Sequence, residues 1–351
     1  MKQMTLTGNT GTCKIMLGES LGSLDDFCDK KKTVVIADST VWRLHGKQFS
    51  EYKVIKANAN ERYKTLDTVN DIYGTLLSYE LDRSSFIVAI GGGIVCDIAG
   101  FVASTYLRGL PFAFVPTTLL AQVDASVGGK NGVNFKGYKN LIGVFNQPQF
   151  VLCDFELLKT LPEEERRNGY AEAIKQALIG DASLFSYLET GYEKALALDS
   201  GAIEKVIHDS LSVKVRIVEE DETEQGERQK LNLGHTFGHA LEKTTGLRHG
   251  EAISIGMVVA ARLSHTRGML GKEDLERITT VLGNFGLPLT TRMDKEAVLD
   301  ALRKDKKRAD REINFVLLEA IGNARIVPIK IKDLEEVMND LCDCSEALFR
   351  K

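Results

Sequence analysis

The stretch SFIVAIGGGIVCDIAGFVAST, residues 85–105, decides the fold class of the first half of the chain. A short apolar run ends at three consecutive glycines, and apolar residues at helical spacing follow, which is typical of a strand, a tight turn and a helix. Similar signals recur in this half, with strand-like runs at 33–39, 111–116 and 149–154 and a helical stripe within 62–81. Because strands and helices alternate, the sequence predicts an α/β domain with a parallel sheet and crossover helices.

The character of the sequence changes just before Pro162. This proline and the three acidic residues after it are typical of a helix N-terminus, and they open a helical segment over 162–181. Long amphipathic segments follow, and a pair of strands is expected within 313–329. We therefore predict two domains, an α/β domain over 1–160 and a mostly α-helical domain over 161–351.

The composition excludes several classes of protein. The chain has 351 residues, of which 43% are hydrophobic and 27% charged, as in ordinary globular proteins. Its formal net charge of −4 argues against nucleic acid or an anionic membrane as the main partner. The six cysteines form no CxxC pair, which fits a reducing compartment. Neither an apolar signal core nor an apolar run of the ~18 residues that a membrane span needs is present, so we expect a cytoplasmic protein.

The glycine turn after the strand at 85–90 has two interpretations. Glycine lets a backbone approach a phosphate closely, and the first N–H groups of a helix attract an anion, so the turn suits a dinucleotide. However, Cys96 and Asp97 stand where a GxGxxG motif would place its third glycine, and a tight structural turn explains the glycines as well. Asp38, at the end of the strand at 33–39, is a candidate partner for a ribose hydroxyl.

A second segment, 116–143, combines glycines with cationic and amide side chains. A solvated surface loop is one explanation. The apolar residues on both sides favour another, in which the ends of the loop are drawn inward and its lysines bind a phosphorylated or carboxylated substrate. Arg108 could add a bidentate grip on an anion. The loop side chains concerned are those of Lys130, Asn131, Asn134, Lys136, Lys139 and Asn140.

The stretch RQKLNLGHTFGHALEK, 228–243, contains two histidines four residues apart. If it is one helix, four polar side chains share a face, those of Arg228, Asn232, His235 and His239. An exposed polar face and a metal site are both consistent with this pattern. His249 follows closely, and Glu172 is an acid within an otherwise apolar helical segment. Two histidines and one carboxylate would leave a divalent cation with open positions, as in catalytic zinc sites. HxxxH lacks the glutamate of HExxH, which argues against a metalloprotease.

These segments, taken together with others along the chain, resemble a known family, the 3-dehydroquinate synthases. The resemblance is carried, in order and at the family's spacing, by GGGIVCDIAGFVASTYLRGLPFAFVPTTLLAQVDASVGGKNGVN, KNLIGVFNQP, LKTLP, AEAIK, NLGHTFGHALE and HGEAISIGM, with a weaker echo at DKK, 305–307. It implies an N-terminal NAD-binding α/β domain with a parallel sheet, a mostly α-helical C-terminal metal-binding domain, and a metal in the cleft between them.

The resemblance also implies a reaction, the conversion of 3-deoxy-D-arabino-heptulosonate 7-phosphate to 3-dehydroquinate and phosphate. NAD takes a hydride from the C5 alcohol, and the new ketone acidifies the neighbouring C–H bond. Phosphate then leaves, bound NADH reduces the ketone, and the ring opens and closes again in an intramolecular aldol step. NAD is returned unchanged, so the net reaction is a phosphate elimination.

Site residues follow from the same resemblance. The implied ligands of zinc or cobalt are Glu172, His235 and His249, while His239 is implied in proton transfer and Glu224 as a second base. Arg108 matches a residue that reaches the site of a neighbouring subunit, which implies a homodimer. Contacts to the phosphorylated sugar acid are implied for Asp124, Lys130, Asn140, Lys175, Lys214, Arg228, Asn232 and Lys307, for which Lys306 is nearly as good a match. Contacts to NAD are implied for Asp38, Glu61, Lys64, Gly92, Gly93, Asp97, Thr117, Thr118, Lys130, Lys139, Thr160 and Asn168.

Four features depart from the family pattern, namely Asn60, Cys96, Asn131 and the segment FKGYKN. They bear on the detailed geometry of NAD binding and remove no implied ligand. Alternative functions are another sugar phosphate cyclase, an NAD- and metal-dependent polyol dehydrogenase, and a binding protein that kept the fold. A dehydrogenase would release NADH and would not need so many lysines to grip a phosphate.

Overall fold

The structure, a computed structural model, describes residues 2–305, 312–330 and 334. Lys306 and Lys307, both considered as substrate contacts, lie outside the described residues. The described chain divides into two compact units: the residues up to 166 together with 203–223, and 167–202 together with the residues from 224 onward. The first unit is α/β and the second is mostly helical, which confirms the predicted fold class.

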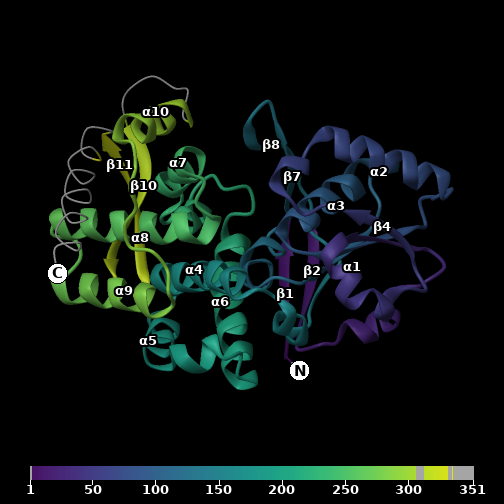
Figure 1. The fold of residues 1–351 in the computed structure, drawn as a ribbon, viewed down its shortest axis with the longest axis horizontal. Helices are drawn as coiled ribbons and strands as arrows, with labels where there is room; N and C mark the ends of the chain where they lie inside the picture. The colour runs from purple at the N-terminus through teal and green to yellow at the C-terminus, as the bar shows by residue number, and fades with distance from the viewer. Residues whose placement is uncertain (1, 306–311, 331–333, 335–351) are drawn as a thin grey trace. The chain divides into compact units, whose positions relative to one another are not determined.

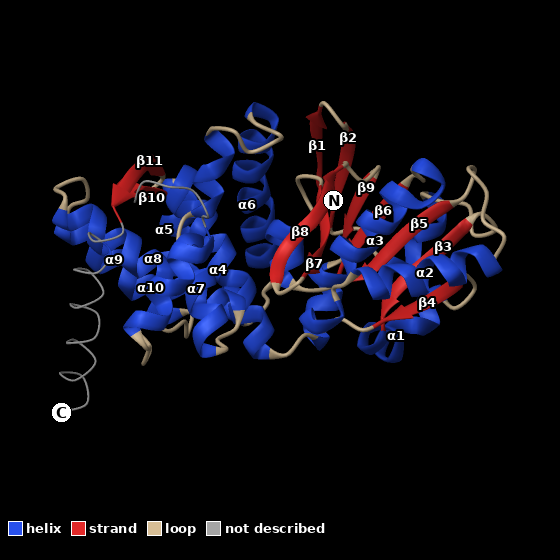
Figure 2. Ribbon diagram, turned by 90° about the horizontal axis from the view of Figure 1, so that it is seen from above, coloured by secondary structure: helices blue, strands red, loops and turns tan. Residues whose placement is uncertain are grey.

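The first unit is built on a seven-stranded sheet with the strand order β1-β2-β9-β6-β5-β3-β4 (Figure 2). All neighbouring strands are parallel except β1 and β2, which form an antiparallel hairpin at one edge. The strands are β1 (Lys2–Gly8), β2 (Gly11–Leu17), β3 (Thr33–Asp38), β4 (Lys53–Ala57), β5 (Phe86–Gly91), β6 (Phe112–Pro116) and β9 (Phe150–Cys153).

The sequence correctly predicts β3, β5, β6 and β9 because their side chains are almost all buried and their apolar runs are continuous. It does not predict β1, β2 or β4. These strands alternate buried and exposed residues over short lengths, so their apolar signal is weaker.

The helices of the first unit include α1 (Ser39–His45), α2 (Leu66–Ser78) and α3 (Gly93–Thr105). Eight residues of α3 are buried, and the helix packs against β5 and β6. Because α3 is apolar on nearly all sides, it lies in the interior of the unit and directs its N-terminus to the end of β5.

Most of α6 (Ser200–Glu220) belongs to the first unit although it lies beyond residue 160. Carboxylates at and just beyond its C-terminal end bind the β1–β2 hairpin. Glu219 Oε1 accepts the Thr7 N–H at 2.9 Å, and Glu222 Oε2 accepts the Thr10 N–H at 3.2 Å. From the sequence we expect a single domain boundary near 160. The structure instead returns the chain to the first unit at 203–223.

The segment 116–143 is not a plain loop. A π-helical turn, Ala121–Ala125, leads into an antiparallel hairpin of β7 (Lys130–Phe135) and β8 (Tyr138–Phe145). Gly132 and Gly143 face each other, and a Cβ on either would lie 2.6 Å from a backbone oxygen of the opposite strand. The expectation of a loop was wrong because the glycines, which suggest a flexible segment, instead let two strands approach closely.

The second unit consists of helices around an antiparallel strand pair (Figure 1). Of these, α8 is buried along most of its length and packs against α7, α9 and β10. The predicted helix over 162–181 and the strand pair within 313–329 are confirmed. The elements are α4 (Glu163–Gly180), α5 (Ala182–Leu196), α7 (His235–Thr245), α8 (His249–Thr266), α9 (Lys272–Asn284), α10 (Lys295–Asp305), β10 (Glu312–Ala320) and β11 (Asn323–Lys330). Within the described part of the chain, no helix has both the length and the apolar character that crossing a membrane requires.

Candidate active site

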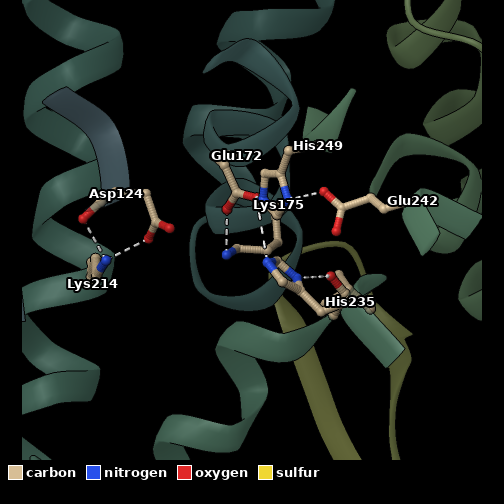
Figure 3. A network of polar contacts seen from close by, with 8 residues as sticks. Asp124, Glu172, Lys175, Lys214, His235, Glu242 and His249 are labelled. Atoms are coloured by element: carbon tan, nitrogen blue, oxygen red, sulfur yellow. Dashed lines mark hydrogen bonds and ion pairs between the residues drawn. The ribbon is translucent and has the colours of Figure 1, made fainter. Parts of the chain in front are cut away.

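One carboxylate and two imidazoles converge in the second unit (Figure 3). Glu172 comes from the middle of α4, His235 is the first residue of α7, and His249 is the first residue of α8. Glu172 Oε1 lies 3.2 Å from His249 Nε2 and 3.6 Å from His235 Nε2. One ligand atom from each side chain lies within 4.8 Å of the others, so the three can bind one divalent cation.

The other polar atoms of these side chains are occupied, and this fixes their orientation. His235 Nδ1 lies 3.1 Å from the Leu233 carbonyl and His249 Nδ1 lies 3.0 Å from Glu242 Oε1, so in each ring Nδ1–H is the donor. Both Nε2 atoms therefore face Glu172. The second oxygen of Glu172 forms an ion pair with Lys175, which leaves Oε1 to the imidazoles. This arrangement fits a metal ion with two neutral nitrogen ligands and one carboxylate.

The electrostatics of the cluster distinguish its two imidazoles. Burial alone would raise the pKa of the fully buried Glu172, but the Lys175 ammonium and the two histidines outweigh it and hold the pKa well below its usual range. Burial and Lys175 hold the pKa of His235 well below its usual value, so the ring is neutral at pH 7. Burial lowers the pKa of His249, but hydrogen bonds to Glu172 and Glu242 overcome this and raise it to about 9. A metal ion bound at Nε2 would therefore take the place of a proton.

The helix expected over 228–243 is interrupted, which corrects the sequence interpretation. A 3-10 turn, Glu227–Asn232, precedes Gly234, whose φ of +78° ends it, and α7 begins at His235. Gly234 packs against α8, where a Cβ on Gly256 would lie 2.0 Å from the Gly234 carbonyl oxygen. Arg228 and Asn232 are therefore not on the same helix as the histidines. Within α7, His235, His239 and Glu242 do share one face.

A cavity of about 390 Å³ opens beside α7 in the second unit. It brings together four predicted site residues, since Glu224, Asn232, His235 and His239 all line it. Asn232 Nδ2 donates to Glu224 Oε1 at 2.6 Å, which positions the carboxylate of the predicted second base. The remaining lining residues are Gln229, Thr236, Asn314, Val316 and Ile326.

The sequence interpretation missed Glu242, Gln229 and Asn314 among the polar residues of this region. Glu242 lies three residues after His239 on the same face of α7, so its position could have been read from the helical period. Asn314 is a polar residue at the start of an apolar strand, and its amide donates to Gln229 Oε1 at 3.2 Å. No sequence signal pairs Asn314 with Gln229, because they meet only through the packing of β10 against the 3-10 turn.

Two other residues implied by the resemblance are buried in this unit. Arg228 is 2% exposed and lies in the 3-10 turn before α7. Asn168, implied as an NAD contact, lies near the start of α4 and packs so closely on α8 that a Cβ on Gly250 would be 2.5 Å from its Cα.

In the first unit, a polar cluster joins residues expected to bind NAD with one expected to bind the substrate. The Lys64 ammonium contacts the carboxylate of Asp97, on α3, and the side-chain oxygen of Asn140, on β8. Burial raises the pKa of Asp97 even though Lys64 opposes the shift. Asn134 Nδ2 donates to Glu61 Oε1 at 2.8 Å, so the β7–β8 hairpin is fastened to the segment that carries Glu61 and Lys64.

Asp124 and Lys214, both expected to contact the substrate, are paired with each other. Lys214 Nζ, on α6, donates to Asp124 Oδ1 at 2.6 Å and to the Asp124 carbonyl at 2.5 Å (Figure 3). Lys214 is 6% exposed. The ion pair gives each of these largely buried charges a partner, so it holds the ammonium in a fixed position.

The glycine turn stands at the end of β5, where parallel sheets usually bind their ligands. A Cβ on Gly91 would lie 2.8 Å from Val95 Cβ, and one on Gly92 would lie 3.0 Å from Thr118 Cγ2. Within the described residues, no side chain caps the N-terminus of α3 at Gly92, so its N–H groups can serve an anion. Asp38 caps α1 by accepting the N–H groups of Thr40 and Val41. In the turn after β5, Gly91 and Gly92 are thus required for steric reasons, and the N-terminus of α3 that follows is suited to binding a phosphate.

The remaining implied residues of the first unit lie in three places. Thr117 and Thr118 follow β6 directly, and Gly93 opens α3. Thr160 accepts a hydrogen bond from His45 Nε2 at 2.8 Å, since its own hydroxyl donates to the Leu157 carbonyl. Thr160 is exposed, and so are Arg108, Lys130 and Lys139.

These features define a class of protein, a two-part chain with a dinucleotide-type α/β unit and a helical unit that carries a divalent-cation site. Comparison with known families identifies it further. The family models described as 3-dehydroquinate synthase N-terminal and 3-dehydroquinate synthase C-terminal match residues 54–168 and 169–308. The chain belongs to the 3-dehydroquinate synthase family.

Individual relatives agree. The chain is 43% identical over 319 residues, 87% of its length and 88% of the relative's, to 3-dehydroquinate synthase of Desulforamulus reducens. Among solved structures it is similar to the 2-epi-5-epi-valiolone synthase ValA of Streptomyces hygroscopicus subsp. jinggangensis with NAD⁺ and Zn²⁺ bound, with a TM-score of 0.88, 28% identity and coverage of 96% and 98% of the two chains. It is also similar to a 2-deoxy-scyllo-inosose synthase complexed with carbaglucose-6-phosphate, NAD⁺ and Co²⁺, with a TM-score of 0.87, 26% identity and coverage of 97% and 100%.

Proposed function

We propose that this chain converts 3-deoxy-D-arabino-heptulosonate 7-phosphate to 3-dehydroquinate and inorganic phosphate, as a 3-dehydroquinate synthase. The observation that carries the proposal is the convergence of Glu172, His235 and His249 in a chain of this family. The metal is Zn²⁺ or Co²⁺, and the dinucleotide is NAD. When bound, the cation would hold substrate hydroxyls and polarise the alcohol, while NAD would accept the hydride and return it.

Two residues of the cavity are suited to moving protons. His239 is exposed, lines the cavity and sits one helical turn after the ligand His235. Glu224 faces the same cavity, and the Asn232 amide holds its carboxylate. We assign His239 to proton transfer at the reacting carbon and Glu224 to the second base.

The anionic groups of the substrate require cationic partners of fixed geometry. Lys214 is positioned by Asp124, and Lys64 joins Asn140 to Asp97, so these parts of the first unit are preorganised. We assign the carboxylate, phosphate and hydroxyls of the substrate to the remaining cationic and polar residues implied by the resemblance, namely Lys130, Lys175, Arg228 and Lys307. In the first unit, NAD is assigned to the glycine turn and to the segment that carries Glu61 and Lys64.

The proposal is tested by phosphate release. Purified protein with the heptulosonate phosphate and a substoichiometric amount of NAD should release one phosphate per substrate, with no net accumulation of NADH at 340 nm, because the hydride returns to the product. Steady accumulation of NADH would instead support a polyol dehydrogenase. Release of phosphate from a different phosphorylated sugar, and none from the heptulosonate, would support another sugar phosphate cyclase.

The assembly is proposed to be a homodimer formed through the first unit. Exposed apolar side chains gather on the β7–β8 hairpin, where Leu141 and Phe145 share a face of β8 and are 56% and 37% exposed. Asn146, just after β8, donates to Ser104 at 2.9 Å, near the end of α3, and the turn that carries Arg108 follows α3 directly. Arg108 has a φ of +70°, so its backbone is held in a strained conformation beside this surface.

Leu141→Glu should convert the dimer into a monomer in sedimentation velocity, because it places a charge in an apolar interface. Leu77→Glu is the matched control, since Leu77 is an exposed leucine on α2, in the same unit and outside the hairpin. A wild-type protein that sediments as a monomer would contradict the proposal, and so would a Leu141→Glu protein that remains dimeric.

The compartment is proposed to be the cytoplasm. Within the described residues the cysteines 13, 28, 96 and 153 are free, as expected where thiols are kept reduced.

A further inference from the structure

His249 lies between two carboxylates (Figure 3). Its Nε2 is 3.2 Å from Glu172 Oε1, and its Nδ1 is 3.0 Å from Glu242 Oε1. Glu242 belongs to α7 and its side chain is only 6% exposed. One ring nitrogen thus faces the proposed metal position, and the other faces a buried carboxylate that the resemblance does not assign.

The two histidines of the proposed metal site are therefore supported differently. Behind His235 stands a neutral acceptor, the Leu233 carbonyl, whereas behind His249 stands the charged acceptor Glu242. A carboxylate that accepts Nδ1–H makes the imidazole a stronger donor at Nε2 and fixes its tautomer and ring direction. Glu242 should therefore increase the metal affinity of the site more than a neutral acceptor in the same position would.

Local geometry places Glu242 at this point. It lies seven residues after His235, which is two turns of α7 on the same face. Gly246, with a φ of +74°, ends α7 and reverses the chain, so that α8 begins at His249 only seven residues after Glu242. The carboxylate and the imidazole are brought together by this short connection.

We infer that Glu242 is a positioning residue, which holds Nδ1–H of His249 and directs Nε2 toward the cation. The inference rests on the proposed metal site. The competing possibility is that Glu242 is itself a ligand, because ligand atoms of His239, Glu242 and His249 also lie within 4.8 Å of one another. Loss of a ligand would change the coordination of the bound ion, whereas loss of a positioning residue would leave the set of coordinating atoms unchanged.

Full-length Glu242→Ala and Glu242→Gln proteins separate these roles when Co²⁺ is the probe. The dissociation constant is measured by competition with a chelator, and the coordination by the visible absorption of the bound Co²⁺. We expect Glu242→Ala to weaken Co²⁺ binding by about 10- to 100-fold, the usual effect of losing such a partner. Glu242→Gln should weaken it less, because the amide oxygen can still accept Nδ1–H. Both variants should keep the wild-type shape and intensity of the Co²⁺ spectrum.

Glu251→Gln is the matched control. Glu251 has the same charge and lies two residues from His249, but it accepts the Arg248 N–H at 2.9 Å and caps α8 instead of binding an imidazole. Its Co²⁺ affinity should stay within about twofold of wild type. Wild-type affinity in Glu242→Ala would overturn this inference alone, as would a changed Co²⁺ spectrum in Glu242→Gln. Failure of the wild-type protein to bind Co²⁺ would overturn the proposed metal site, and this inference with it.

Discussion

Replacing His235 with alanine should leave the protein without its metal and without turnover. The side chain is 12% exposed, its Nε2 faces Glu172 Oε1 at 3.6 Å, and its Nδ1–H is held by a backbone carbonyl, so the ring is oriented toward the proposed cation position. With Glu172 and His249 alone, the affinity for Zn²⁺ or Co²⁺ should fall by more than about 100-fold, because losing a ligand exceeds the cost of losing its outer partner. Metal content after gel filtration and phosphate release measure the two effects.

A second histidine of the same unit provides the control. His265 lies on α8, and its Nδ1 is 2.9 Å from the Leu270 carbonyl, an arrangement like that of His235 but away from Glu172. His265→Ala should retain full metal content. Treating the wild-type protein with a chelator should abolish phosphate release, and added Zn²⁺ or Co²⁺ should restore it. A His235→Ala protein that binds metal as tightly as wild type would remove His235 from the ligand set.

The parts of the fold that the sequence predicts well are those with strong local signals. The buried strands β3 and β5 are continuous apolar runs, and α4 begins with a proline and acidic residues, so local pattern and tertiary environment agree. The β7–β8 hairpin was expected to be a loop because glycines are typical of flexible segments. In the structure these glycines let two strands approach closely, and the sequence alone does not show that tertiary contact. The return of α6 to the first unit has the same origin, since it depends on carboxylates that bind a turn some 210 positions earlier in the chain.

The candidate site illustrates the same limit. Spacing alone left open which histidines would accompany an acid, because Glu172 is 63 and 77 positions from His235 and His249, and only the packing of α4, α7 and α8 brings them together. The resemblance supplied the choice. The break at Gly234 could not be read from the sequence either, because an isolated glycine is tolerated in a helical pattern and its contact with Gly256 is visible only in three dimensions.

Replacing His239 with alanine should give the opposite result to His235→Ala, a protein that keeps its metal but turns over slowly. His239 and His235 rings are 5.3 Å apart, yet only His235 belongs to the group that contains the buried Glu172. Loss of a group that transfers a proton usually slows a reaction by about 10²- to 10⁴-fold. We therefore expect wild-type metal content with kcat reduced by that factor, measured as phosphate release.

Thr236→Ala is the comparison for this last experiment. Thr236 lines the same cavity on the same helix and has no group that titrates near neutral pH, so its loss should change kcat far less. The outcome also decides between the two groups of possible ligands. If His239→Ala lost its metal, the ion would belong to the more exposed group of His239, Glu242 and His249, and the split between ligand and proton carrier would be wrong. Retention of metal with slow turnover would assign the cation to the group of Glu172, His235 and His249, because His239 is not a member of that group.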